Sequence, residues 1–407
     1  MSNTAIIAEY NPFHNGHKYL IDTAKYETNS RHIFAIMSGD FVQRGSLSIC
    51  SKYDRAAAAI NGGLSAVFEL PAYYALGSAR DFAQGSIQLL NATRSVDYLA
   101  FGVENKDNQK FDQFSDLLAK ESQTYQFSLR EKLAKGISFP KARASALIEI
   151  LGEEVREFIT LPNNNLALSY MVALKQSNSS IKPIMIERKN VAHHSKVANE
   201  NFASASYIRT NIMKGLPISS FIPEESYQKM ASSLESPLSN SDQSYLSLLI
   251  SQILLDGSLE DKNIWELSPD FARRLNKIKK PFLYEELCEY CHTKNLTRTH
   301  VERVLMHLIL GMKESEANTI KANGLGYLNL LALDNQSSDL IKEMKENSEL
   351  SIITKKAAYK PLSQADRYSW AMDKKAVNLY QSLLFYRWQK YIPSELESTV
   401  VTNSIKN

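Results

Sequence analysis

Residues 4–20 read TAIIAEYNPFHNGHKYL, an apolar run followed by a short polar turn. The isoleucine-rich run is typical of a buried parallel strand, and the Asn-Pro step ends it. His14, Gly16 and His17 then lie where a helix is expected to begin. The start of a helix presents unpaired backbone N–H groups and the positive end of the helix dipole, so a strand that enters a helix through a tight turn binds anions. This stretch predicts a phosphate site at the edge of an α/β sheet.

The two histidines strengthen that prediction through their spacing. His14 and His17 are three residues apart, which places both imidazoles on one face of the first helical turn, within reach of one phosphate. Gly16 has no Cβ and lets a phosphate approach the backbone closely. In the structural alternative, one histidine caps the helix and the other is exposed. The position directly after the first strand favours a nucleotide-triphosphate site without a Walker lysine loop, because open α/β sheets bind ligands there.

The rest of the N-terminal half alternates predicted strands and helices, as expected for a parallel sheet with helical crossovers. The predicted strands lie at residues 4–10, 31–37, 66–70, 96–102 and 181–188. Helices are predicted at 15–28 and 52–61, and Ser78 and Asp81 form the capping box of a third. We predict an α/β fold with a Rossmann-like domain over residues 1–220, a helical insertion at about 105–160, and a mostly α-helical domain over 221–407.

Composition limits the class of protein. The 407 residues allow two domains, and 44% hydrophobic with 22% charged residues is ordinary for a globular chain. The apolar runs are too short to cross a membrane, so no membrane partner is expected. Three cysteines, an odd number, suggest a reducing cytoplasm. Cys288 and Cys291 have metal-ligand spacing, but no second pair completes a zinc site, so we interpret them as thiols on a helix and predict no protein metal site.

Further candidate site residues follow the later strands. Arg44 lies after the second strand, where its planar guanidinium suits a phosphate or carboxylate, although it could also be an ordinary surface side chain. Gly102 ends the fourth strand and would let a base or ribose lie against the backbone. Arg188 ends the fifth strand at the same edge. These residues add positive charge and space to the predicted site.

Two more motifs lie at expected helix starts. The hydroxyls of Ser204 and Ser206, with free helix-start N–H groups, can hold phosphates that Arg209 neutralises one turn later. A plain serine cap with a solvated arginine is the alternative. Asn163 and Asn164 also lie at a helix start, where asparagine usually caps.

The sequence resembles a known family at several of these motifs. Residues 14–17 match the His-x-Gly-His signature of the nucleotidylyltransferase superfamily, whose members join ATP to an acid or phosphate and release pyrophosphate. Residues 7–20, 37–45 (MSGDFVQRG) and 68–71 (FELP) resemble more specifically the bacterial tRNA(Met) cytidine acetate ligase family. Residues 203–209 resemble the second superfamily signature. The resemblance is dense in the N-terminal half and thin in the C-terminal half.

The resemblance implies a reaction and a site. ATP and acetate would give acetyl-adenylate and pyrophosphate, and the acetyl group would pass to the wobble cytidine of elongator tRNA(Met) as N4-acetylcytidine. Mg²⁺ bridging the phosphate oxygens is expected. The implied catalytic residues are His14, His17, Arg44 and Arg209. The implied ATP-binding residues are Ile7, Ala8, Glu9, Tyr10, Asn11, Pro12, Phe13, His14, Asn15, Gly16, His17, Lys18, Tyr19, Leu20, Gly102, Asn163, Asn164, Arg188, Ser204 and Ser206. Which asparagine of 163–165 contacts ATP stays open.

Two basic clusters in the C-terminal half are candidates for tRNA phosphate contacts, because faces of Lys and Arg give salt-dependent affinity for nucleic acid. The candidate residues are Arg273, Arg274, Lys277, Lys279, Lys280, Arg298 and Arg303. We expect His307 to share one helical face with the last two. An ordinary solvated face is the alternative. The net charge of +3 neither requires nor excludes RNA, and DNA is not an expected partner.

Two other functions are alternatives. A metabolic adenylyl- or cytidylyltransferase acting on a small phosphate ester would share the nucleotide site but has no use for a basic helical domain. A non-catalytic tRNA-binding protein that uses ATP as a regulatory switch would keep both features without the reaction.

Overall fold

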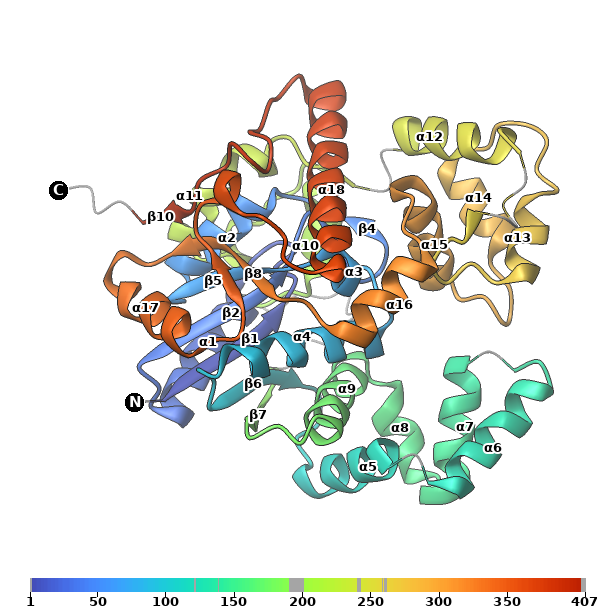
Figure 1. The fold of residues 1–407 in the computed structure, drawn as a ribbon, viewed down its shortest axis with the longest axis horizontal. Helices are drawn as coiled ribbons and strands as arrows, with labels where there is room; N and C mark the ends of the chain where they lie inside the picture. The colour runs from blue at the N-terminus through green and yellow to red at the C-terminus, as the bar shows by residue number, and fades with distance from the viewer. Residues whose placement is uncertain are drawn as a thin grey trace.

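The computed structural model describes residues 2–120, 122–137, 139–189, 201–239, 243–257, 259 and 262–403. An eight-stranded sheet runs through the centre of the molecule in the order β10-β8-β5-β2-β1-β6-β7, and β9 pairs with β8 (Figure 1). Successive residues of β1 (Asn3–Ala8) belong to two different cores: Ala5 and Ile7 to one, and Ile6 to the other. Helices therefore bury both faces of the sheet, as expected for parallel strands joined by helical crossovers.

The N-terminal half contains the predicted parallel sheet. Its strands are β1, β2 (His32–Ser38), β5 (Ala66–Leu70), β6 (Tyr98–Val103) and β7 (Lys182–Glu187), and each pairs in parallel with its neighbours among them. Their crossover and flanking helices include α1 (Asn15–Thr28), α2 (Lys52–Asn61), α3 (Ala72–Ala75) and α4 (Ala79–Thr93). A short hairpin of β3 (Phe41–Val42) and β4 (Ser46–Leu47) follows β2. The predicted capping box of Ser78 and Asp81 is present at the start of α4.

A group of helices separates β6 from β7, as predicted for the insertion. It contains α5 (Asn108–Lys120), α6 (Gln123–Ala134), α7 (Phe139–Leu151), α8 (Glu154–Thr160) and α9 (Pro162–Gln176). Helix α9 packs against α4 and α5 and leads back to the sheet, whereas α6 and α7 pack on each other farther out (Figure 1).

The C-terminal half is mostly helical, as predicted. Its helices are α10 (Ala205–Met213), α11 (Glu224–Leu234), α12 (Gln243–Leu255), α13 (Pro269–Leu275), α14 (Tyr284–Cys291), α15 (Arg298–Leu310), α16 (Glu314–Asn323), α17 (Ser338–Asn347) and α18 (Gln364–Trp388). It also returns to the sheet with β8 (Tyr327–Leu333), β9 (Ser351–Ile353) and β10 (Val401–Thr402), which were not predicted. Strand β8 lies antiparallel to β5, so residues from both sides of the predicted boundary at 220 share one sheet.

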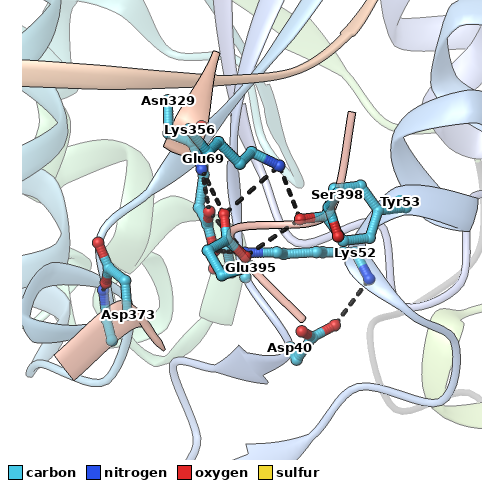
Figure 2. Close-up of polar contacts among 12 residues, drawn as sticks. Asp40, Lys52, Tyr53, Glu69, Asn329, Lys356, Asp373, Glu395 and Ser398 are labelled. Carbon is cyan, nitrogen blue, oxygen red and sulfur yellow. Dashed lines mark hydrogen bonds and ion pairs between the residues drawn. The ribbon is translucent and has the colours of Figure 1, made fainter. Parts of the chain in front are cut away.

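A buried network of charges joins the end of the chain to α2 and β5 (Figure 2). Lys52 is fully buried, and its Nζ lies 2.7 Å from Glu69 Oε1 and 2.6 Å from Glu395 Oε2. Asn329 Nδ2 donates hydrogen bonds to both carboxylates at 2.8 and 2.9 Å, and Lys356 Nζ lies 3.4 Å from Glu395 Oε1. Two ammonium groups therefore balance two carboxylates in the interior, and the segment around Glu395 is fixed to the sheet.

The charges of Lys52 and Glu395 stabilise each other. Burial opposes the charge of Lys52, but the carboxylates of Glu395 and Glu69 outweigh burial and raise the pKa of its ammonium group. Burial likewise raises the pKa of Glu395, but Lys52 and Lys356 outweigh it and bring that pKa down to about 2.

Among the described residues, no helix is both long and apolar enough to cross a membrane.

Candidate active site

A cavity of about 580 Å³ opens where β1, β6 and β7 end, at the carboxyl edge of the sheet. The N-terminal ends of α1, α9 and α10 contribute to its walls, together with the loop that follows β2. Most of the predicted nucleotide-site residues line it, namely Ile7, Ala8, Glu9, Tyr10, Asn11, His14, Gly16, His17, Tyr19, Leu20, Arg44, Gly102, Asn163, Arg188, Ser204, Ser206 and Arg209. The fold thus brings residues from distant parts of the chain to one edge.

The two histidines cap α1 and line the cavity at the same time. His14 is the N-cap residue, and its Nδ1 accepts a hydrogen bond from the backbone N–H of Gly16 at 3.0 Å. His17 Nδ1 accepts from the backbone N–H of His14 at 3.2 Å, and the two rings stack with centroids 3.7 Å apart. Because Nδ1 is the acceptor in both neutral rings, each ring carries its proton on Nε2. The alternative with one exposed histidine is wrong, since His14 is buried and His17 half-buried.

Both imidazoles are held neutral. Burial, together with the positive charges of Arg188 and Arg209, lowers the pKa of His14 to about 3. Burial and the neighbouring His14 likewise lower the pKa of His17. The pair therefore offers Nε2–H donors, while the arginines supply the positive charge. Gly16 makes this arrangement possible, because a Cβ there would lie 2.8 Å from Cε1 of His14.

The second motif begins α10 on the same cavity. Ser204 is the N-cap residue, accepts a hydrogen bond from the N–H of Tyr207 at 3.2 Å, and lies 3.0 Å from Ser206, oxygen to oxygen. Arg209 Nη1 donates to the carbonyl oxygen of Asn11 at 2.7 Å, which joins α10 to the turn after β1. The N-termini of α1 and α10 therefore converge on one cavity, an arrangement that favours a polyanion.

The structure separates the two candidate asparagines. Asn163 lines the cavity, where it donates to Glu104 Oε1 at 2.5 Å and accepts from Arg188 Nη1 at 3.2 Å. Asn164 is fully buried, and its Oδ1 accepts from the backbone N–H of Glu104 at 3.0 Å, outside the cavity lining. The geometry therefore favours Asn163 for a ligand contact.

The loop after β2 is anchored by an arginine that was not predicted. Arg55 on α2 is fully buried and donates to the carbonyl oxygens of Glu9 at 2.5 Å and Ser38 at 3.2 Å. Gln43 donates from its side chain to Gly77 O at 3.1 Å, so the loop is held on both sides. Arg44 remains exposed at the cavity and takes part in no hydrogen bond or ion pair with the described residues. An arginine within an alanine-rich helix was the only signal for Arg55 in the sequence.

Five residues predicted to bind ATP lie outside the cavity lining: Pro12, Phe13, Asn15, Lys18 and Asn164. Phe13 is buried in the hydrophobic core, where its ring lies next to Gly62. Lys18 pairs with Asp22 at 2.9 Å, and Asn15 donates to the carbonyl oxygen of Ser220 at 2.9 Å. The prediction that the whole stretch 7–20 contacts the nucleotide is therefore too broad for these side chains.

The predicted tRNA face on α15 is wrong for two of its three residues. Arg303 is 7% exposed, and its Nε pairs with Glu266 at 2.6 Å. His307 is fully buried and stacks on Trp265 with ring centroids 4.6 Å apart, and its ring nitrogens lie 3.0 Å from the carbonyl oxygen of Trp265 and 2.9 Å from that of Leu76. This face of α15 is core, so neither residue can reach a phosphate.

The other candidate tRNA-binding residues differ in whether acidic side chains neutralise their charge. Arg298 pairs with Glu285, Glu289 and Glu302, each at 2.6 or 2.7 Å. Arg273 pairs with Asp270, and Arg274 donates to the carbonyl oxygen of Cys291. Lys277, Lys279 and Lys280 are exposed beyond α13, where a role in tRNA binding stays a prediction.

The two cysteines with metal-ligand spacing lie on one helix. Cys288 and Cys291 are free and buried on α14. Across the described ranges, no group of three or more His, Cys, Asp and Glu side chains could hold a metal ion.

Comparison with known proteins decides the family. A model of the HIGH nucleotidyl transferase family matches residues 1–392. The chain belongs to this family. Among HIGH nucleotidyl transferases, it is 34% identical to the tRNA(Met) cytidine acetate ligase of Thermoanaerobacter sp. (strain X514), over 88% of this chain and 90% of the relative. It is 32% identical to the enzyme of that name from Clostridium kluyveri (strain ATCC 8527), over 87% and 90%. The family resemblance of the sequence is thereby confirmed.

Solved structures support the fold of this HIGH nucleotidyl transferase. The chain matches apo Thermotoga maritima TmcAL with a TM-score of 0.90 and 24% identity, over 99% of both chains. It matches the same protein bound with alpha-thio ATP with a TM-score of 0.88 and 23% identity, over 99% of both chains. The α/β sheet with its helical C-terminal part is therefore an arrangement already seen in crystals.

Proposed function

We propose that this chain is an ATP-dependent ligase that acetylates the wobble cytidine of elongator tRNA(Met) to N4-acetylcytidine. The observation that carries the proposal is the cavity on which the N-termini of α1 and α10, two neutral imidazoles and the guanidinium groups of Arg188 and Arg209 converge. The relatives named as tRNA(Met) cytidine acetate ligases support the substrates, and a solved structure of TmcAL holds alpha-thio ATP. An enzyme that acts on tRNA would work in the cytoplasm.

The first step activates acetate. A carboxylate oxygen of acetate attacks the α-phosphorus of ATP, the bond to the bridging oxygen breaks, and pyrophosphate leaves with the electron pair. The Nε2–H groups of His14 and His17 donate hydrogen bonds to the phosphate under attack and to the departing group. Arg209 and the start of α10 stabilise the charge that grows on pyrophosphate. Arg44, at the cavity, adds a further positive charge. Catalysis rests on positioning and charge, without a covalent enzyme intermediate.

The second step transfers the acetyl group. The exocyclic amine of cytidine attacks the carbonyl carbon of acetyl-adenylate, AMP leaves, and the nitrogen loses a proton. This amine is reachable only when the base is unpaired, which suits an anticodon loop whose bases can be turned outward.

Mg²⁺ is expected to enter with ATP. Mg²⁺ in nucleotide sites takes one or two carboxylates and the substrate's phosphate oxygens, and keeps several waters. The described lining of the cavity offers two carboxylates, Glu9 and Glu187, which fits such a site. The ion would supply charge neutralisation for the phosphates, and the chain's own residues position them.

Labelled acetate tests the proposal directly. Purified protein, ATP, labelled acetate and bulk tRNA should give labelled N4-acetylcytidine after nuclease digestion, and acetate should be needed for ATP–pyrophosphate exchange. His17→Gln removes the imidazole but keeps an acceptor for the helix cap, and should abolish both reactions. Lys18→Ala, on the next residue but outside the cavity lining, should leave them unchanged. Exchange that depends on a phosphorylated metabolite in place of acetate would refute the proposal.

A further inference from the structure

A second cavity, of about 380 Å³, lies on the other side of α4 and α9. It is enclosed by helices of the insertion together with those two helices. Its described lining consists of Arg80, Gln84, Leu118, Tyr125, Gln126, Leu129, Arg130, Leu133, Arg143, Ser169, Val172, Ala173 and Gln176. No step of the proposed reaction uses this cavity.

Three arginines line the second cavity. They are Arg80, Arg130 and Arg143, and the described lining contains no Asp or Glu. Arg143 donates from Nη1 to Asn165 Oδ1 at 3.2 Å. Burial lowers the pKa of Arg143, a hydrogen bond with the Tyr125 side chain opposes that shift, and the nearby charge of Arg80 adds to it. Arg130 is exposed and makes no ion pair within the described part of the chain. The guanidinium groups of Arg130, exposed, and Arg143, half-buried, therefore favour an anion as the ligand of this cavity.

The uncharged side chains of the second cavity favour a ligand larger than an inorganic anion. Leu118, Leu129, Leu133 and Val172 provide an aliphatic surface, and Gln84, Gln126 and Gln176 provide amide donors and acceptors. A nucleotide would match the aliphatic surface with the face of its base, the amide groups with the edge of its base, and the arginines with its phosphate. Proteins that recognise single-stranded RNA turn bases out of the strand and hold them by stacking and edge hydrogen bonds.

The second cavity adjoins the ATP cavity. On α4, Ala79 and Phe82 line the ATP cavity, whereas Arg80 and Gln84 line the second one. Asn165 on α9 lines the ATP cavity while it accepts the hydrogen bond from Arg143. The two cavities are thus separated by no more than the width of a helix, about 10 Å.

We propose that the second cavity binds a nucleotide of the RNA substrate that neighbours the acetylated cytidine. This proposal rests on the proposed function. Arg130 and Arg143 contact the phosphates of that nucleotide, and the leucine and glutamine side chains receive its base. The contact would hold the RNA strand while the neighbouring cytidine enters the ATP cavity, so it concerns the second step and not the activation of acetate.

The test separates tRNA binding from acetate activation. Arg130→Gln should weaken binding of unmodified tRNA and make the slope of log affinity against log salt shallower by about 0.7, the value for one lost contact to a single-stranded phosphate. Acetate-dependent ATP–pyrophosphate exchange without tRNA should stay at the wild-type rate, which also shows that the variant is folded. Lys141→Gln is the matched control, since Lys141 is exposed on α7 and does not line the cavity.

Three results overturn the inference. Wild-type tRNA affinity and salt slope in Arg130→Gln would mean that the cavity does not contact RNA. A slower exchange reaction in folded Arg130→Gln would mean that the cavity serves the ATP step. Release of bound tRNA from the wild type, but not from Arg130→Gln, by millimolar inorganic phosphate would mean that the cavity is a free-phosphate site. If the wild-type protein shows no acetate-dependent exchange, the proposed function has failed instead, so the two failures are distinguishable.

Discussion

Replacing Lys52 with methionine tests the buried charge network. The substitution keeps most of the side-chain volume and removes the ammonium group that lies 2.7 Å from Glu69 and 2.6 Å from Glu395. The two carboxylates then face each other in the interior, with Lys356 3.4 Å from Glu395 as the remaining cation. Breaking a buried ion pair by removing one partner costs about 3–5 kcal/mol. We expect Lys52→Met to lower the free energy of unfolding by that amount.

A double-mutant cycle isolates the interaction from the other effects of the substitution. Glu395→Gln removes the carboxylate and keeps a side chain of similar shape. In the double variant, one charge of each sign is gone, and Lys356 remains to face Glu69. The loss for the double variant should therefore be smaller than the sum of the single losses by about 1–3 kcal/mol. Urea unfolding followed by tryptophan fluorescence measures each value.

A surface pair provides the control for this cycle. Lys18 and Asp22 lie 2.9 Å apart, but their side chains are 42% and 58% exposed, so the same cycle there should give a coupling of about 0.5 kcal/mol or less. Additive losses in the Lys52 and Glu395 variants, within about 0.5 kcal/mol, would refute the reasoning that the network ties the end of the chain to the sheet.

Three further substitutions test two helix caps and the hairpin that follows β2. His14→Asn keeps a residue that can cap α1 but removes the imidazole. In the wild type, the unfolded state binds a proton at His14 below a pH of about 6.5, whereas the native state binds it only near pH 3, so stability falls as the pH falls between these values. Stability should therefore depend less steeply on pH in the variant, as measured by acid unfolding followed by circular dichroism. Gly45→Ala should cost more than about 1 kcal/mol in urea unfolding, because Gly45 has φ of 73° and a Cβ would overlap the backbone of Arg303; an unchanged midpoint would contradict this. Ser78→Ala should cost about 1 kcal/mol by removing the α4 cap, whereas Ser78→Asp should retain most of the stability.

Local patterns predicted most of the N-terminal half. Helices α1 and α2 begin and end at the expected residues, because a histidine or serine cap starts each one and an asparagine or glycine, which favour helix ends, follows it. Strands β1, β2, β5 and β6 are mostly apolar runs buried on both faces, which is a strong signal over five to seven residues, whereas the edge strand β7 is buried only at Met185 and Ile186. The cavity follows from the topology, since parallel strands end at one edge.

Contacts between distant segments determine several features that local sequence patterns could not predict. Strand β8 is as apolar as the predicted strands, but its antiparallel pairing with β5 joins segments more than 250 residues apart in the chain, which no local pattern encodes. Arg303 and His307 have the composition of a basic face, yet Glu266 and Trp265 cover them. Asn163 and Asn164 are identical in type, and only the rotation of α9 places one in the cavity and the other behind it.

The most direct test of the central claim is a crystal structure of the protein with a non-hydrolysable ATP analogue. The phosphates should lie between the starts of α1 and α10, with Nε2 of His14 and His17 about 2.7–3.2 Å from phosphate oxygens. Arg209 should face the β- or γ-phosphate, and Asn163 should contact the nucleotide while Asn164 does not. A nucleotide bound elsewhere, or phosphates in the second cavity beside Arg143, would contradict the account.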